Sequence, residues 1–135
     1  MTVFAHNNPQ GTITATVTAT SLADAGDPIV IGSGVETLVN VDVANSGQAL
    51  TDFALLIQEH PDATFKTYLS GTDWATATSN LTFAASGLNT LASGSADNFH
   101  VNLRGAHAFK FQASVASSTT TLTIRYSIAT RGRGV

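Results

Sequence analysis

The sequence contains no cysteine, only two lysines and few charged residues of either sign. The absence of cysteine excludes disulfide bonds, thiolate metal sites and cysteine nucleophiles. Charged residues make up 11% of the chain, against about 25% in a typical soluble domain. Six basic and nine acidic residues give a formal net charge of −3, so the basic patch that offsets phosphates in nucleic-acid-binding proteins is lacking. We therefore predict no nucleic-acid partner.

Long apolar runs are also missing. No stretch approaches the roughly 18 apolar residues that a membrane-spanning helix needs, and the first ten residues lack the basic and apolar parts of a signal peptide. We expect no membrane partner, and a chain made and used in the cytoplasm or built into a particle there. The low content of Lys and Glu is typical of protein–protein contact surfaces, although a Thr- and Ala-rich composition explains it equally well.

The pattern that dominates the chain is an alternation of apolar and polar residues. In the segment 12–20, Ile13, Ala15, Val17 and Ala19 alternate with threonines, which is typical of a strand with one face in a core and one in water. The same alternation predicts strands over residues 35–43, 99–103, 107–115 and 122–128. Shorter or less regular apolar runs predict further strands over residues 28–31, 53–57, 65–69 and 81–83, of which 53–57 is apolar throughout and is expected to be central.

Turn signals rich in Gly, Asn, Asp and Ser separate these runs at intervals of roughly 8–12 residues. We therefore predict an all-β fold: an antiparallel, jelly-roll-like β-sandwich of about eight strands, with extended N- and C-terminal arms. The expected organisation is an N-terminal arm (1–11), one sandwich domain (12–129) and a C-terminal tail (130–135). Residues 73–78 fit one helical turn. Residues 84–98 fit either a long loop or a strand around 88–91.

Catalytic or metal-binding patterns are hard to find. The four histidines, His6, His60, His100 and His107, have no metal-site spacing. His60, between Glu59 and Pro61-Asp62, fits a turn, and Asp24 with Asp27 offers too few ligands for calcium. Glu36 and Asp42 would stand about 20 Å apart along one strand, too far for a carboxylate pair. We predict no enzyme, with no catalytic, cofactor-binding or metal-binding residues.

Aromatic residues offer one alternative function. Exposed aromatic rings on a β-sandwich can stack on sugars, so Trp74, Tyr68 and Tyr126 raise the possibility of a carbohydrate-binding module. Aromatic residues are only 7% of the chain, however, and Tyr126 is in phase with Leu122 and Ile124. Core packing is the favoured interpretation for these rings, with Trp74 closing one end of the sandwich.

The two ends carry candidate interface residues. Val3, Phe4 and His6 lie in an N-terminal segment that can add as a strand to a neighbour's sheet edge. Arg131 and Arg133 lie in a Gly-rich cationic tail that can become ordered on an acidic neighbour. We predict these five residues as a partner interface. The alternative is that both ends simply fray.

Three segments resemble small structural proteins of tailed bacteriophages: Val35–Gly47, Leu50–Ile57, and Ala108–Ser114 leading into Thr120–Ser127. The resemblance covers about two-thirds of the chain in the style of its strands and includes no diagnostic motif. It implies a capsid decoration (cement) protein, a non-enzymatic virion component that binds the major capsid protein between capsomers, as a homotrimer. The expected location is the capsid surface of a virion assembled in the host cytoplasm. The alternatives are a tail or fibre attachment domain and the sugar-binding module.

Overall fold

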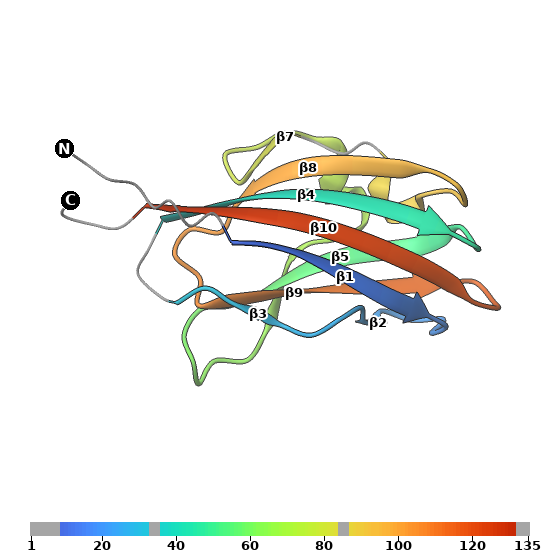
Figure 1. Ribbon diagram of the computed structural model, residues 1–135, viewed down its shortest axis with the longest axis horizontal. Helices are drawn as coiled ribbons and strands as arrows, with labels where there is room; N and C mark the ends of the chain where they lie inside the picture. Colours follow the sequence, from blue (N-terminus) through green and yellow to red (C-terminus); the bar gives the residue numbers. More distant parts are fainter. Residues whose placement is uncertain (1–8, 33–35, 84–86, 132–135) are drawn as a thin grey trace.

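The computed structural model describes residues 9–32, 36–83 and 87–131. In these three ranges the structure has ten strands and two short 3₁₀ helices, and Figure 1 shows how the strands are arranged. Their bounds are β1 (Gln10–Val17), β2 (Ala23–Asp24), β3 (Ile29–Val30), β4 (Glu36–Ser46), β5 (Leu50–Gln58), β6 (Lys66–Leu69), η1 (Gly71–Ala75), β7 (Leu81–Phe83), η2 (Leu88–Thr90), β8 (Ala96–Asn102), β9 (Ala108–Val115) and β10 (Thr120–Arg131). Within these ranges, no helix reaches the length and apolarity that crossing a membrane demands.

The strands form two antiparallel sheets packed as a sandwich. Sheet A has the order β1-β10-β4-β8-β7, and sheet B has the order β2-β9-β5-β6, with β3 also paired to β9. The pairings are nested: β1 pairs with β10, β2 and β3 with β9, β4 with β8, and β5 with β6. This nesting of early strands with late ones is the topology of a jelly roll. The predicted all-β sandwich is therefore confirmed.

Most predicted strands are present, and several are longer than their apolar pattern. β4 and β10 each continue beyond the expected ends, so residues 130 and 131 of the predicted tail belong to β10. β1 begins at Gln10, inside the predicted arm, and ends at Val17 instead of at residue 20. The two-residue strand β2 was not predicted, because Ala23–Asp24 is too short to show any alternation. The segment 84–98, for which either a loop or a strand around 88–91 was expected, contains η2 and the start of β8 within its described part, so the strand alternative at 88–91 is wrong. The single helical turn expected at 73–78 lies slightly earlier, as η1.

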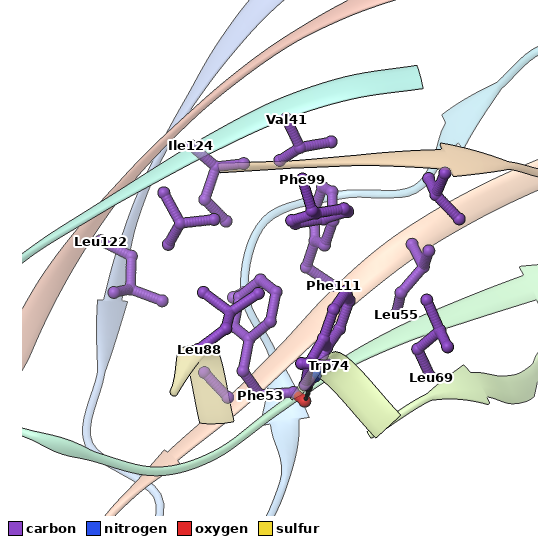
Figure 2. Close-up of a cluster of buried hydrophobic side chains, with 14 of the residues drawn as sticks. Val41, Phe53, Leu55, Leu69, Trp74, Leu88, Phe99, Phe111, Leu122 and Ile124 are labelled. Atoms are coloured by element: carbon purple, nitrogen blue, oxygen red, sulfur yellow. Dashed lines mark hydrogen bonds between the residues drawn. The ribbon is translucent and has the colours of Figure 1, made fainter. Parts of the chain in front are cut away.

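The core lies between the two sheets and is rich in aromatic side chains. The ring of Phe53 in sheet B contacts both Phe111 of the same sheet and Trp74 of η1, and the Trp74 ring centroid lies 4.7 Å from that of Phe99 in sheet A (Figure 2). All four rings are essentially inaccessible to solvent. Full burial of each such side chain contributes about 1.5–3 kcal/mol, so this cluster is a main source of stability for the sandwich.

A buried polar network closes the end of the sandwich where β4 turns into β5. The Asn45 side chain is 2% exposed; its amide donates to the carbonyls of Leu91 and Gln48, and its oxygen accepts from the Thr120 hydroxyl. The Asn45 backbone amide donates to Ser95. Since buried polar groups are costly when unpaired, these bonds fix the loop before β8 against the β4–β5 and β9–β10 turns.

Candidate functional site

The outer face of sheet A carries two rows of polar side chains that run across four strands. In one row, Thr12, Arg125, Asp42 and Asn98 are direct cross-strand neighbours on β1, β10, β4 and β8. In the next, Gln10, Ser127, Asn40 and His100 stand in the same relation. These eight residues line an open groove of about 590 Å³. Because side chains alternate along a strand, the residues between them point into the core.

Arg125 and Asp42 bring opposite charges together near the middle of this groove. They are paired directly in the β4–β10 ladder, where side chains on one face start about 5 Å apart. Arg125 is exposed and Asp42 is partly exposed. The groove thus offers a guanidinium, a carboxylate and several amides and hydroxyls, which suit hydrogen bonding to a polar protein surface.

Gly11 and Tyr126 shape the floor of the groove. Gly11 lies opposite Tyr126 in the β1–β10 pair, and a Cβ atom at Gly11 would lie 2.3 Å from the tyrosine hydroxyl. The ring therefore occupies the space that any larger residue at position 11 would need. Tyr126 also packs edge-on against Phe109, with ring centroids 6.2 Å apart, which ties the groove to the core.

The described histidines do not meet to form a catalytic or metal centre. His100 lies in the groove, His60 is exposed in a turn closed by the Ala63 amide bonding to its carbonyl, and His107 is half-buried before β9. Over residues 9–32, 36–83 and 87–131, no group of three or more His, Asp or Glu residues has metal-site geometry. His6 lies outside the described residues.

Asp24 is held within its own sheet. Its carboxylate accepts a hydrogen bond from the Gln112 side chain at 2.9 Å and pairs with the Lys110 ammonium at 3.1 Å. The Gln112 bond lowers the pKa of Asp24, with a further lowering from Lys110, while partial burial opposes both. These contacts link β2 to β9, so the Asp24 carboxylate has a structural role.

The aromatic side chains of the sugar-binding alternative are used for packing. Trp74 is fully buried, and its indole N–H donates to the Phe53 carbonyl at 2.8 Å. The Tyr68 hydroxyl donates to the Asn102 carbonyl at 2.7 Å, and burial raises its pKa against the opposing effect of nearby Arg104. The stacking platform that a carbohydrate-binding module requires from Trp74 is therefore not formed, and the core-packing interpretation is confirmed.

The five residues predicted as a partner interface mostly lie outside the described part of the chain. Val3, Phe4, His6 and Arg133 fall in the segments 1–8 and 132–135. The backbone of Arg131 ends β10 and pairs with Glu36 of β4. Thus position 131 belongs to the sandwich, and the interface prediction for these residues stays a prediction.

The groove itself was not recognised in the sequence. The alternation predicts its strands one at a time, over residues 12–20, 35–43, 99–103 and 122–128, without indicating which of them are neighbours. What brings Arg125 next to Asp42 is the pairing of β10 with β4, two strands separated by most of the chain. The alternation predicts which face a residue occupies, whereas the neighbours depend on strand order and register.

Comparison with known proteins supports the fold. No protein-family model matches the chain, and no curated protein matches it. Among solved structures, the crystal structure of the SPBc2 prophage-derived protein YomS is similar, with a TM-score of 0.50 and 14% sequence identity. The match covers 95% of this chain and 100% of that one. At this identity the likeness shows a shared fold alone.

Proposed function

We propose that the chain is a structural component of a bacteriophage particle, and that it decorates the capsid by binding the major capsid protein between capsomers. In this proposal it has no enzymatic activity. It is assembled in the host cytoplasm and works on the capsid surface. The observation that carries the proposal is the polar groove across the outer face of sheet A.

The composition of the groove supports a protein partner. Its two polar rows contain one Arg and one Asp but no Lys and no Glu. Protein interfaces are enriched in Arg and depleted in Lys, Glu and Asp, so the groove matches this composition except at Asp42. The eight side chains stand on four hydrogen-bonded strands, so little conformational entropy is lost when a partner docks. Weak contacts of this kind, repeated over a capsid lattice, give strong attachment through avidity.

The bacteriophage setting rests on likeness. Three strand segments resemble small phage structural proteins, and the similar crystal structure carries a prophage-derived name. A tail or fibre attachment domain of the same particle is the competing assignment. Both assignments use the groove, but they place the protein on different parts of the virion.

The test is co-sedimentation of the purified protein with particles of its own phage from which it has been removed, and with separated capsids and tails. Wild-type protein should saturate sites on capsids. Arg125→Glu should reduce occupancy at least tenfold, because a second carboxylate then stands opposite Asp42 and the groove loses its guanidinium. Lys66→Glu makes the same change of charge at an exposed residue of β6 in the other sheet; it is the control and should bind as wild type.

Binding to tails alone would move the assignment to the attachment domain. Equal occupancy of the Arg125→Glu and Lys66→Glu proteins on capsids would contradict a role for the groove. Failure of wild-type protein to bind either fraction would contradict the virion role itself.

The C-terminal tail gives a second test of the interface residues. Because β10 includes Thr130 and Arg131, which pair with Thr37 and Glu36, a truncation should begin after residue 131. Deleting residues 132–135 should leave the melting temperature unchanged and weaken attachment to capsids, because it removes the Arg133 charge. Unchanged occupancy would exclude Arg133 from the interface.

A further inference from the structure

Strand β1 forms a free edge of sheet A. It pairs with β10 on one side over eight consecutive residues, in regular register. On the other side, within the described part of the chain, its backbone groups have no hydrogen-bonded partner outside the β1–β10 ladder. A strand of eight residues presents an edge about 26 Å long.

The register identifies which backbone groups face outward. The Ile128 amide donates to the Pro9 carbonyl at 2.8 Å, and these residues continue the β1–β10 register by one step, so they form a hydrogen-bonded pair. Such pairs alternate with non-hydrogen-bonded ones. The amides and carbonyls that point toward β10 are thus those of the odd-numbered residues. The amides and carbonyls at the free edge belong to Gln10, Thr12, Thr14 and Thr16.

The other three edges of the sandwich are protected by features known to prevent strand addition. β7 has three residues and an irregular register with β8. The edge formed by β2 and β3 consists of two-residue strands on either side of Pro28. β6 has four residues, begins with exposed Lys66 and is paired to β5 through a bulge. Short strands, lysine, proline and bulges all prevent edge-to-edge pairing.

β1 has none of these features. Its sequence from Gln10 to Val17 contains no charge and no proline, and its pairing has no bulge. Ile13 is covered from within by the loop at Gly26, where a Cβ atom would lie 2.5 Å from the isoleucine. What β1 offers to a partner is therefore its backbone edge and a row of threonines.

We propose that β1 pairs antiparallel with β1 of a second copy of this chain, so that two sheets A join into one continuous sheet about a two-fold axis. In one register every outward backbone amide and carbonyl forms a hydrogen bond with the second copy. This register places Gln10 opposite Thr16 and Thr12 opposite Thr14 of the second copy. A charged strand would meet its own charges in such a pairing, whereas here threonine meets threonine. The uncharged edge therefore fits a second copy of itself.

An apolar surface adjoins the same edge. A groove of about 300 Å³ is lined mainly by apolar side chains, namely Pro9, which precedes β1, Ile29, Val30, Ile31, Tyr126 and Ile128, with Thr130 beside them. Val30 is 66% exposed, unusually open for its type. A second copy beside β1 would shield this apolar surface from water, adding hydrophobic burial to the backbone hydrogen bonds. The proposed pairing closes with two copies and differs from the homotrimer implied by resemblance to decoration proteins.

The test uses purified protein without particles, so that it is independent of the virion role. Light scattering after size exclusion should give twice the chain mass of 13.9 kDa. Thr14→Lys should give the monomer mass, or weaken association at least tenfold, because the two lysines then stand diagonally across the two-fold axis, within reach of each other. The matched control is Thr123→Lys, which adds the same charge on the same face directly opposite Thr14, but on interior strand β10; it should remain a dimer. Circular dichroism and thermal melting establish that both variants fold.

A monomeric or trimeric wild type, or a Thr14→Lys protein that stays dimeric, would overturn the proposal. Loss of the dimer in both variants would assign the contact to the face of sheet A and would also overturn the proposal.

Hydrogen exchange provides a residue-level measurement. Amides of Thr12, Thr14 and Thr16 should gain protection as protein concentration rises, while those of Ile13, Ala15 and Val17, bonded to β10, should be protected throughout. Equal concentration dependence in both sets would contradict edge pairing.

Discussion

The outer faces of the two sheets differ in how much of their surface the chain itself uses. On sheet B, Ala54, Leu56 and Ala108 point away from the central core, yet at most 8% of each is exposed. The Lys110 ammonium lies 4.7 Å from the centre of the Phe65 ring and also pairs with Asp24. On sheet A, outward side chains that include Thr12, Asn40, Asn98, Arg125 and His100 line an open groove.

The difference shows how one repeating pattern yields two kinds of surface. Both sheets alternate side chains between core and outside, but the outward side chains described above for sheet B are either covered, as Ala54 and Leu56 are, or bonded to one another, as Lys110 and Gln112 are to Asp24. Many outward side chains of sheet A line the groove instead, where they can hydrogen-bond to another molecule. Changes to sheet B should therefore affect stability, whereas changes to sheet A should affect association.

The largest expected effect comes from placing the same charge on each outer face. Ala54→Asp buries a carboxylate at a position with no solvent exposure and should lower the free energy of unfolding by about 3 kcal/mol or more. Ala44→Asp makes the same substitution at a partly exposed position on the outer face of β4 and should cost about 1 kcal/mol or less. Urea unfolding of both variants measures the difference. Similar losses would contradict the contrast between the faces.

A smaller effect is expected from removing one cation on each face. Lys110→Ala removes both the Asp24 ion pair and the contact with the Phe65 ring, and should cost about 1 kcal/mol. Arg125→Ala should change the free energy of unfolding by about 0.5 kcal/mol or less, although it should weaken capsid binding. Urea unfolding, together with the co-sedimentation assay, separates the two. A larger stability loss for Arg125→Ala would show that the groove is structural.

Much of this fold could be predicted because its strands are locally regular. The Thr-Ile-Thr-Ala-Thr pattern of β1 and the Phe-Lys-Phe pattern of β9 indicate period two without any knowledge of their partners. β2 could not be predicted, because its two residues are set by pairing with Ala113 and Gln112 of β9. The observed end of β10 differs from the predicted end at residue 128 for the same reason, because Thr130 and Arg131 pair with Thr37 and Glu36 of β4.

The candidate site was less predictable than the fold. The individual outward residues were visible in the alternation, but the groove arises from the β1-β10-β4-β8 order, which brings residues near 12, 42, 98 and 125 into one row. The free edge is likewise a property of topology, since the sequence of β1 looks like that of any half-buried strand. Trp74 was placed correctly in the core because few other aromatic residues were present to build a platform.

The smallest expected effect is a pH dependence that belongs to sheet B. Because the folded state lowers the pKa of Asp24, its ionised form stabilises the protein above the unfolded-state pKa, and this contribution is lost as pH falls through the folded-state pKa. Unfolding free energies of wild type and Asp24→Asn should therefore converge as pH falls from about 5 to 2. The change in unfolding free energy should be smaller than that of Lys110→Ala, since 52% of the Asp24 side chain is exposed.

The Gln112 bond is the largest cause of the lowered pKa of Asp24, so Gln112→Ala should reduce the convergence of the two pH profiles more than Lys110→Ala does. Parallel pH profiles for wild type and Asp24→Asn would show that the β2–β9 contact contributes nothing through its charge.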